Sequence, residues 1–376
     1  MRYALIIAGG SGTRLWPMST KELPKQLIPF IGGEAGGDAG DDSGGRSLLQ
    51  VAMERLDGLL PPEQVYVCAG ESTKAVMLDK LPGLTEGRFI GEPMGRDTLN
   101  AVGLGCSVLK HKDPEATVAI FTADHLIEPV DELLKIVDRG FALAEARADT
   151  LVTFGVSPTH AATGYGYLQL GEALDGGGFV VDQFKEKPDA EVASSYFDAG
   201  PEKYLWNSGM FVWRADAVMR CIEKYAPANF GPLDGLGRTW DEPGRDARLA
   251  EVYPTLEKVS VDYAVMEPAS RDEAMTVAAV PMPLSWLDVG SWPSFAGTLA
   301  KDADGHAASG GPVVHLDSRN VLTASSEPGH LIATLGCDDL IVIHTPTATL
   351  VCRSDQAEKI KALHSKVGEQ VGQEYL

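Results

Sequence analysis

The sequence predicts an α/β fold: a doubly wound, mostly parallel sheet followed by a small β-rich C-terminal domain that ends in a helix. From the N-terminus to residue 156, short apolar runs alternate with amphipathic segments, which is typical of parallel strands joined by crossover helices. Residues 301–311, rich in Gly, Ala and Asp, then precede short apolar runs spaced by roughly ten residues. We therefore expect two domains, residues 1–300 and residues 301–376, and a chain of 376 residues is long enough for both.

The expected elements follow from the periodicity of the apolar residues. Strands are expected at residues 3–7, 65–69, 89–93, 118–121 and 151–156, and helices at residues 47–60, 97–109, 133–147, 218–225 and 246–253. Short strands with polar turns are expected at residues 164–213, a β-rich series at residues 313–352, and a closing helix at residues 355–371. Ligands bind at the carboxyl ends of the strands in such a sheet, so the residues that follow the strands are the first candidates for a site.

Composition excludes several classes of partner. The formal net charge of −21 argues against nucleic acid and anionic membranes, because a chain this acidic repels phosphate groups unless its cations are concentrated locally. The five cysteines are odd in number and widely spaced, which indicates reduced thiols rather than a disulfide framework. No apolar stretch is long enough for a signal peptide or a membrane span. We therefore expect a soluble, cytoplasmic protein.

The segment AGGSGTRLWP, residues 8–17, follows the first apolar run. Its glycines allow the backbone to turn with positive φ and to approach a ligand closely, and successive N–H groups in such a turn bind anions. Arg14 and, further on, Lys25 of the segment PKQ add positive charge. The dinucleotide fingerprint is excluded because Leu15 stands where it needs glycine, and the P-loop because the chain lacks its Gly-Lys-Ser/Thr ending. These residues predict a site for the phosphates of a nucleoside triphosphate.

Two aspartates are candidates for holding a divalent cation. Asp124 follows the apolar strand at 118–121, and Mg²⁺ prefers one or two carboxylates together with phosphate oxygens and water. Asp288 stands alone between large apolar residues and must be paired or metal-bound if it is buried. Taken singly, Asp124 fits a solvated acid at a turn somewhat better than a metal ligand. Side-chain alternation at a strand end points His125 away from Asp124, so we do not expect His125 to be a ligand.

The segments GGSGTRLWP and PKQ together resemble the signature of the sugar-1-phosphate nucleotidyltransferases, and most closely that of the mannose-1-phosphate guanylyltransferases (GDP-mannose pyrophosphorylases). The resemblance covers the chain, strongly to about residue 300 and more weakly beyond it. It implies a Rossmann-like, GT-A-like sheet and a β-helix-like tail, with no cupin-type isomerase domain following. It also implies that Arg14, Lys25 and Lys187 are catalytic, and that Asp124 and Asp288 together hold Mg²⁺.

The resemblance further implies which groups contact each substrate. The nucleotide is expected to contact Ala8, Gly9, Gly10, Ser11, Gly12, Thr13, Glu92, Pro93 and Arg96. The sugar is expected to contact Gly164, Gly166, Glu186, Asn207, Gly209 and Asp262, which lie in the segments TGYGY, FKEKP, WNSGMF and SVDYAVME. Without the family match, the glycine-bearing turns are equally compatible with plain hairpin turns. Asp262 and Glu267 share one segment, and a role in bracing the core is as good an interpretation for them.

Two features depart from the family pattern. The glycine-rich acidic segment at residues 31–45 resembles an insertion, and it is either a lid near the triphosphate or a tolerated surface loop. Asp97, Leu99 and Ala123 stand where relatives usually have Asn, Ala and Ser. Because these three positions are expected beside the nucleotide, they leave the choice of base open.

The resemblance implies transfer of GMP from GTP to mannose 1-phosphate, which gives GDP-mannose and pyrophosphate. An attacking sugar phosphate is already an anion and needs no general base, and the sequence shows no obvious Ser/His/Asp or Cys/His constellation. One alternative keeps the chemistry but uses glucose 1-phosphate with dTTP or UTP. Another is a non-catalytic subunit that senses the nucleotide sugar. The apolar β-rich tail leads us to expect a homodimer.

Overall fold

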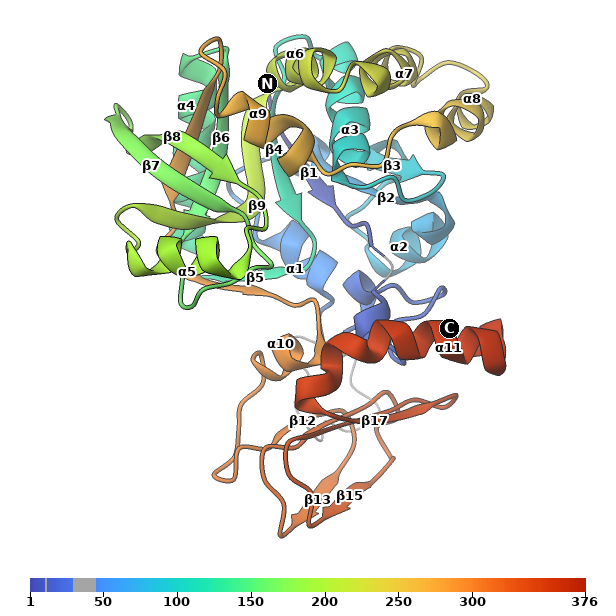
Figure 1. Cartoon of the computed structure of the whole chain (residues 1–376). Coiled ribbons are helices and arrows are strands. Elements are labelled where there is room, and N and C mark those ends of the chain that lie inside the picture. The colour runs from blue at the N-terminus through green and yellow to red at the C-terminus, as the bar shows by residue number, and fades with distance from the viewer. Residues whose placement is uncertain (11, 30–44) are drawn as a thin grey trace. The chain divides into compact units, whose positions relative to one another are not determined.

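The structure is a computed structural model that describes residues 1–10, 12–29 and 45–376. Ser11 and almost all of the glycine-rich acidic segment therefore lie outside the described residues. The chain forms two compact units, shown with the whole chain in Figure 1. Unit 1 comprises Met1–Gly9, Met53–Thr122 and Ile127–Trp286, and unit 2 comprises Gly10–Ala52, Ala123–Leu126 and Leu287–Leu376. Each unit is discontinuous in sequence, and the division at residue 300 stays a prediction.

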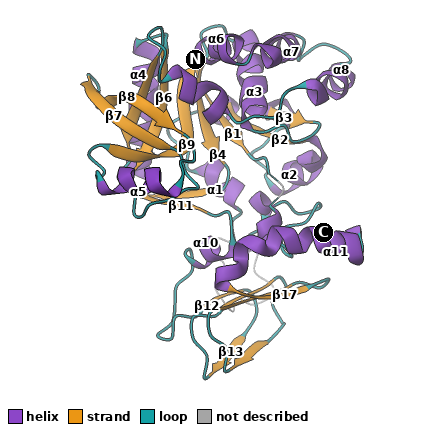
Figure 2. Cartoon of the chain, in the orientation of Figure 1, coloured by secondary structure: helices purple, strands orange, loops and turns teal. Residues whose placement is uncertain are grey.

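The main sheet and most of the helices belong to unit 1 (Figure 2). Its strands are β1 (Arg2–Ile7), β2 (Val65–Gly70), β3 (Phe89–Glu92), β4 (Thr117–Thr122), β6 (Thr150–Val156), β7 (Tyr167–Leu174), β8 (Gly178–Lys185), β9 (Tyr204–Arg214) and β10 (Thr276–Pro281). Its helices are α2 (Lys74–Lys80), α3 (Thr98–Lys112), α4 (Val130–Ala146), α5 (Ala190–Asp198), α6 (Ala215–Tyr225), α7 (Pro227–Arg238), α8 (Arg245–Val252) and α9 (Glu267–Ala269). Helix α1 (Leu48–Glu54) spans the boundary between the units in sequence.

The order of the main sheet is β3-β2-β1-β4-β9-β6-β10-β8-β7. Strand β1 pairs in parallel with β2 and with β4, so Ile7 lies opposite Cys68 and Thr122 at the carboxyl ends of the three strands. Strand β9 runs antiparallel between β4 and β6, and β8 runs antiparallel to β10. The α/β prediction is confirmed, and the sheet is a mixed one in which the antiparallel strands come from the region predicted as short strands and turns.

The two faces of the sheet are covered by different helices. Phe211 and Trp213 of β9 belong to the large core that α3, α6 and α7 close. Val212, between them, points to the opposite face, where the glycine at position 140 lets α4 pack closely on Phe154 and Val212. A Cβ on Gly140 would lie 2.8 Å from the Phe154 ring. This two-sided cover confirms the doubly wound arrangement.

Unit 2 contains the β-rich C-terminal part of the chain. Its strands are β12 (Ala307–Ser309), β13 (Val313–Leu316), β14 (Leu322–Ser325), β15 (Ile332–Leu335), β16 (Leu340–His344) and β17 (Thr349–Arg353). Successive strands alternate between a sheet of order β12-β14-β16-β17 and a sheet of β13 and β15, with parallel pairing from β12 to β16. This alternation is the geometry of a β-helix, as the resemblance implied. Helix α11 (Ile360–Gln370) follows.

Unit 2 also contains the glycine-rich turn and its own apolar core. Trp16 and Trp292 pack in this core with Leu322 and Ile343 from the β-rich strands. The indole N–H of Trp292 donates to the Trp16 carbonyl at 3.1 Å. Helix α10 (Trp292–Ala296) and the strands of the tail therefore support the segment around Trp16 directly.

Several elements differ from the sequence prediction. Helix α1 ends at Glu54 rather than near residue 60, because the following residues form turns. Helix α7 was not predicted, since its sequence PANFGPLDGLGR is rich in glycine and proline; Leu233 and Leu236 stabilise it by packing into the core. Strand β12 begins inside the predicted linker. Strands β5 (His125–Glu128) and β11 (Ser285–Asp288), which pair with each other, were also missed.

Among the described residues, no helix has the length and apolar character to cross a membrane.

Candidate active site

The glycine-rich turn leads into a short 3₁₀ helix, Thr13–Leu15, in unit 2. Gly10 and Gly12 have φ of 101° and 60°, values that favour glycine, as the sequence predicted. A Cβ on Gly12 would lie 2.3 Å from Ser19 Oγ and 3.0 Å from Lys25 Cβ. Gly12 is therefore required both by its backbone conformation and by the close approach of the segment that carries Lys25.

The two predicted metal ligands meet in unit 2. A carboxylate oxygen of Asp124, one of Asp288 and a ring nitrogen of His125 lie within 4.8 Å of one another. The Val289 N–H donates to the Asp124 carbonyl at 2.9 Å, which ties together the backbones that carry the two acids. The predicted juxtaposition of Asp124 and Asp288 is thus present, although the chain separates them widely.

Lys25 belongs to the same group. Its Nζ lies 2.5 Å from Asp124 Oδ2, and both side chains are largely buried. Burial alone would raise the pKa of Asp124, but the charges of Lys25 and His125 outweigh it and hold that pKa below its usual range. Burial and the charge of Asp124 raise the pKa of Asp288. The pKa values of the two acids therefore shift in opposite directions, because their negative charges repel each other. A cation shared by both carboxylates would relieve that repulsion.

The structure contradicts the reasoning that pointed His125 away from Asp124, whereas the expectation that His125 is not a ligand stays a prediction. That reasoning went wrong at one point. It assumed that Asp124 and His125 are consecutive residues of one strand. In the structure β4 ends at Thr122, Asp124 lies in a bend, and His125 starts β5. Side-chain alternation does not apply across a bend, and His125 Nε2 lies 3.9 Å from Asp124 Oδ1.

Arg14 lies beside the acids. A Cβ on Gly290 would lie 3.2 Å from Asp288 Oδ1 and 3.4 Å from the Arg14 guanidinium, so both side chains border the same glycine. Arg14 also donates to both carboxylate oxygens of Glu358 at 3.3 Å. Unit 2 thus gathers Arg14, Lys25, Asp124 and Asp288, and this group is called the phosphate cluster below.

A second polar cluster lies in unit 1, at the residues predicted to bind the sugar. Asn207 donates to Asp262 Oδ1 at 2.8 Å and accepts from Thr153 Oγ1 at 2.8 Å. The backbone N–H of Asn207 donates to the Gly166 carbonyl at 2.8 Å. A Cβ on Gly166 would lie 2.5 Å from a carboxylate oxygen of Glu186. Gly166, Glu186, Asn207 and Asp262 are therefore neighbours, and with Lys187 they are called the sugar cluster.

Electrostatics within the sugar cluster favour a proton on one acid. Burial, and then the charge of Glu186, raise the pKa of Asp262 to about 7. Lys187 pairs with Glu186 at 2.8 Å and is half exposed. Lys187 has φ of 43°, a left-handed conformation that is uncommon for a residue with a side chain. A strained backbone at a charged, exposed residue is a feature often found at functional sites.

Two predicted sugar residues have weaker structural support. Gly209 has φ of 71° and its N–H donates to the Asn207 side chain at 3.2 Å, so it shapes the turn that carries Asn207. Gly164 has an ordinary φ, and a Cβ there would meet no atom within 4 Å. The structure therefore gives no steric reason for glycine at position 164.

The predicted base-side residues lie at the end of β3 and just beyond it. Glu92 is buried, burial raises the pKa of its carboxyl, and the hydroxyl of Tyr253 donates to it. A Cβ on Gly9 would lie 3.9 Å from Glu92 Oε2, so these two predicted residues are neighbours. Pro93, which follows, is exposed, and the Arg96 guanidinium donates to the Pro254 carbonyl. Arg96 thus bridges two backbone segments.

Sequence reasoning missed two residues that hold these groups: Thr153, which holds Asn207, and Tyr253, which donates to Glu92. Glu267, for which a bracing role was considered, accepts from the Glu186 backbone N–H at 3.4 Å. Thr153 lies in an apolar run, where a polar group that must find a partner was the available clue.

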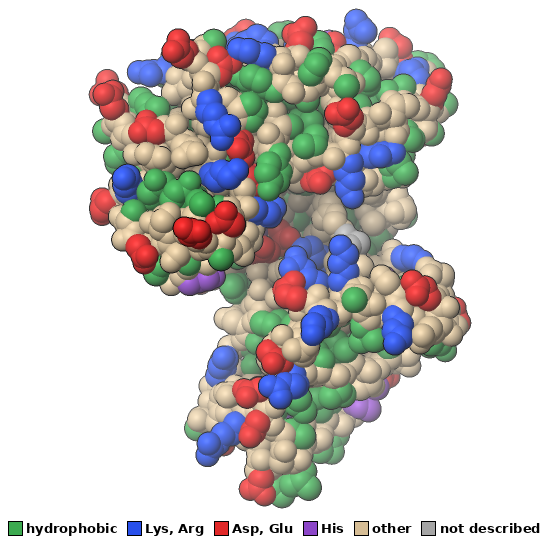
Figure 3. All heavy atoms as spheres, in the orientation of Figure 1, with side chains coloured by type: hydrophobic (Ala, Val, Ile, Leu, Met, Phe, Trp, Pro, Cys, Tyr) green, Lys and Arg blue, Asp and Glu red, His purple; other side chains and the backbone are tan. Residues whose placement is uncertain are grey.

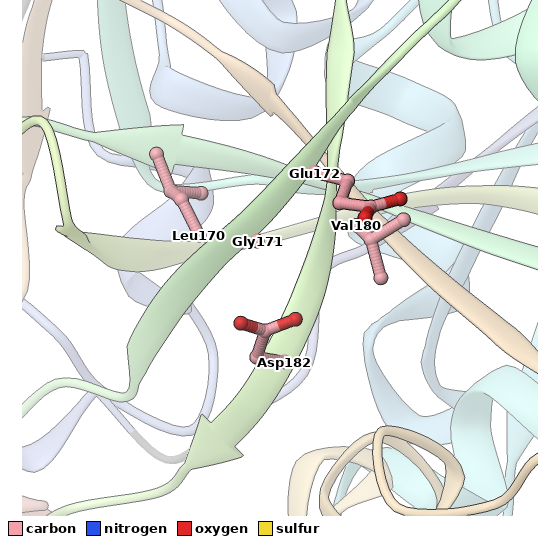
Figure 4. Close-up of a pocket in the computed structure, with 5 residues that line it drawn as sticks. All are labelled: Leu170, Gly171, Glu172, Val180 and Asp182. Atoms are coloured by element: carbon pink, nitrogen blue, oxygen red, sulfur yellow. The ribbon is translucent and has the colours of Figure 1, made fainter.

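Other surface features lie outside the two clusters. A hollow of about 670 Å³ against β7 and β8 is lined by Leu170, Gly171, Glu172, Val180 and Asp182 (Figure 4). None of these residues belongs to either cluster, and we assign the hollow no role. On the face shown in Figure 3, Lys and Arg side chains are interspersed with Asp and Glu. This face therefore carries mixed charge rather than a field of one sign.

The fold and the phosphate cluster together define a class. A parallel β1–β2–β4 core, a glycine-rich turn after β1 and two adjacent aspartates with a lysine are the parts of an α/β enzyme that handles nucleotide phosphates. The family model described as nucleotidyl transferase matches residues 3–305. The MannoseP isomerase/GMP-like beta-helix domain matches residues 311–366. The chain belongs to the nucleotidyl transferase family.

Relatives of known name agree with this membership. The mannose-1-phosphate guanylyltransferase of Escherichia coli (strain K12) is 34% identical over an alignment of 381 positions, gaps included, that covers 98% of this chain and 73% of that protein. The xanthan biosynthesis protein XanB of Xanthomonas campestris pv. campestris (strain B100) is 31% identical, over 96% of this chain and 72% of that protein. The crystal structure of mannose-1-phosphate geranyltransferase from Thermus thermophilus has a TM-score of 0.81 and 29% identity, and the match covers 97% of this chain and 99% of that chain.

Nucleotidyltransferases generally use a divalent metal, and the donors of the phosphate cluster fit one. Hard divalent cations favour carboxylate oxygens, and the two aspartates offer them close together. The two carboxylates lie within 4.8 Å of each other, and the charge of Asp124 adds to burial in raising the pKa of Asp288, so a cation between them would relieve their repulsion. His125 adds a nitrogen donor, which Mg²⁺ does not favour.

Proposed function

We propose that the protein transfers GMP from GTP to α-D-mannose 1-phosphate and releases pyrophosphate. The observation that carries this proposal is the phosphate cluster, in which Asp124 and Asp288 lie within reach of one cation and Lys25 lies beside them. Family membership and the relatives named mannose-1-phosphate guanylyltransferase support the choice of substrates. The resident cation in this proposal is Mg²⁺, held by Asp124 and Asp288.

The chemistry requires little beyond alignment and charge stabilisation. An anionic phosphate oxygen of the sugar phosphate attacks the α-phosphorus of GTP and forms a new P–O bond. The bond from the α-phosphorus to the bridging oxygen breaks, and its electron pair leaves with pyrophosphate. No proton is removed from the attacking oxygen, so no general base is assigned. When bound, Mg²⁺ supplies electrostatic stabilisation of the phosphate charge.

The residues of the phosphate cluster have distinct parts in this proposal. An ammonium has three N–H donors, so Lys25 can hold Asp124 and a phosphate oxygen at the same time. Arg14 donates to both carboxylate oxygens of Glu358, and its guanidinium can donate to two phosphate oxygens in the same way. The backbone amides of the glycine-rich turn complete the set. We assign these groups to the charge that accumulates on the leaving pyrophosphate.

The sugar cluster is assigned to mannose 1-phosphate. Lys187 is half exposed and carries a positive charge, as a group that holds the sugar phosphate must. Glu186, Asn207 and Asp262 offer both donors and acceptors for sugar hydroxyls. A carboxyl with a pKa of about 7, as at Asp262, can donate or accept a hydrogen bond near neutral pH. Glu92 and Arg96 are assigned to the base and ribose.

One assay tests the proposal: pyrophosphate release from GTP and mannose 1-phosphate in the presence of Mg²⁺. We expect release that requires all three components. Parallel reactions with dTTP or UTP and glucose 1-phosphate distinguish the nearest alternative, and faster release there would replace the proposed substrates. Protein that binds GDP-mannose but releases no pyrophosphate with any pair would instead be a sensing subunit.

We also propose that the protein acts as a homodimer in the cytoplasm. Apolar side chains of the two-stranded sheet are exposed, among them Val314 and Leu316 on β13 and Leu335 on β15. The cysteines are free thiols, which suits a reducing compartment. Light scattering of the wild type and of Leu335→Lys tests the dimer: we expect twice the mass of 40.1 kDa for the former only.

A further inference from the structure

A second group of possible metal ligands lies far from the phosphate cluster in sequence, in the β-rich part of unit 2. Ligand atoms of Glu327, His330 and His344 lie within 4.8 Å of one another. His344 Nε2 lies 2.9 Å from Glu327 Oε2, and the rings of His330 and His344 are stacked with centroids 3.6 Å apart. His344 is largely buried, whereas His330 is exposed. The group is therefore accessible from solvent on the side of His330.

The backbone that carries these side chains is held by several hydrogen bonds. His344 ends β16 opposite Ser325 of β14, and the Ser326 N–H donates to the His344 carbonyl at 3.0 Å. The Ser325 hydroxyl donates to the Glu327 carbonyl at 3.0 Å, and the His330 N–H donates to the same carbonyl at 3.0 Å. A Cβ on Gly311 would lie 2.3 Å from the His330 carbonyl, so the turn from 325 to 330 packs tightly on its neighbour.

We propose that Glu327, His330 and His344 bind a divalent transition metal ion, with Zn²⁺ as the best match. Two imidazoles and one carboxylate, with a fourth position left to water, form a common zinc ligand set. Nitrogen donors favour Zn²⁺, Cu²⁺ and Ni²⁺ over Mg²⁺. This group offers two imidazoles and one carboxylate, whereas Asp124 and Asp288 have one imidazole, that of His125, beside two carboxylates. Tetrahedral ligands at about 2.0–2.1 Å from zinc lie roughly 3.3 Å apart. An ion in the plane of one stacked ring lies outside the plane of the other, so the exposed His330 ring must turn out of its stack on His344 to become a ligand.

The hydrogen bond on the far side of His344 suits both the empty and the loaded state. His344 Nδ1 lies 3.0 Å from the Thr349 hydroxyl, which can donate or accept. Without metal, His344 Nε2–H donates to Glu327 and Nδ1 accepts from Thr349. With metal, Nδ1–H donates to Thr349, and the Nε2 lone pair faces the ion. Such an outer hydrogen bond typically contributes a factor of about 10–100 to metal affinity.

A stacked histidine pair elsewhere in unit 2 shows what this group has in addition. The rings of His306 and His315 are also stacked, with centroids 3.9 Å apart. No carboxylate joins that pair among the groups of possible ligands that the described residues form. The inference therefore rests on Glu327 together with the two rings, and it is independent of the proposed reaction.

The test is equilibrium dialysis of the full chain against Zn²⁺ in excess Mg²⁺, which occupies carboxylate sites without competing for imidazole. Glu327→Gln, His330→Ala and His344→Ala remove single ligands, and Thr349→Val removes only the outer hydrogen bond. His111→Asn is the matched control, because His111 pairs with Asp234 at 3.2 Å in an exposed site without a second ring. Zn²⁺-dependent thermal unfolding of the same proteins gives a second readout.

We expect the wild type and the His111 variant to bind one Zn²⁺ that each ligand variant binds at least tenfold more weakly. Thr349→Val is expected to bind it about tenfold more weakly. Zn²⁺ is expected to raise the unfolding temperature of the wild type but not that of the ligand variants. Equal binding by the wild type and His330→Ala, whose exposed side chain is not needed for folding, would overturn the proposal. An equal loss in the His111 variant would overturn it as well, since binding would then be nonspecific.

Discussion

The phosphate cluster and the sugar cluster each pair a lysine with a carboxylate, but the two lysines differ in exposure. Lys25 is 11% exposed and lies against Asp124, whereas Lys187 is 52% exposed and lies against Glu186. The buried ammonium helps to hold the pKa of Asp124 below its usual range. In the sugar cluster, burial and Glu186 raise the pKa of Asp262 to about 7. A buried lysine thus favours the ionised form of Asp124 in one region, whereas burial beside another acid favours a proton on Asp262 in the other.

The largest expected effect comes from removing the ionised acid of the phosphate cluster. Asp124→Ala is expected to lower turnover by about a hundredfold or more, because a cation-holding carboxylate is lost where charge develops. Pyrophosphate release measures it, with circular dichroism to verify folding. Asp234→Ala, which removes an acid that pairs with Lys110 at the surface, is the control and should keep wild-type turnover. Wild-type turnover in folded Asp124→Ala would refute the assignment.

Removing the buried lysine should have a similar but somewhat smaller effect. Lys25→Ala is expected to lower kcat by about a hundredfold, since it removes one donor to the leaving phosphates. The control is Lys21→Ala, whose ammonium donates to Gln373 at 2.8 Å and is not part of the cluster. If both lysine variants lose activity equally, the loss reflects the general charge of the segment and not the position of Lys25.

A sugar-cluster variant should change substrate binding more than turnover. Asp262→Asn keeps the shape of the side chain and an acceptor for Asn207 but cannot ionise. We expect KM for mannose 1-phosphate to rise about tenfold, which corresponds to about 1.4 kcal/mol, while KM for GTP stays near its wild-type value. Initial rates with each substrate varied in turn measure this. An equal rise in both KM values would contradict the assignment of the sugar cluster to mannose 1-phosphate alone.

The smallest expected effect is on the pH dependence of stability. The folded-state pKa of Asp262 is raised from 3.8 to about 7, so the native protein binds a proton that the unfolded chain has released. The contribution of this group to stability is complete below pH 3.8 and is lost as the pH rises through 7. Asp262→Asn should therefore lose fewer degrees of unfolding temperature between pH 5 and pH 8 than the wild type, by a few degrees. Parallel profiles for the two proteins would contradict the raised pKa.

The sequence predicts those parts of the fold and site that depend on local pattern. Strand β1, the positive φ of Gly12 and the place of Asp124 after β4 follow from apolar runs and glycine spacing. The bond from Tyr253 to Glu92 joins residues 161 positions apart, and no local pattern reports such a contact. The meeting of Asp288 with Asp124 was available only through the family resemblance. His125 was misplaced because a bend interrupts the strand, and helix α7 because core packing outweighs its poor helix propensity.

The shared core of unit 2 has a consequence for dividing the chain. Leu15 and Trp16, next to Arg14, are buried among residues of α10 and of the β-rich strands, including Leu322 and Ile343. A fragment cut at residue 300 would expose this apolar surface and deprive the glycine-rich turn of its support. Chimeras that exchange the tail between relatives should therefore exchange the N-terminal turn as well, because the two segments share one apolar core.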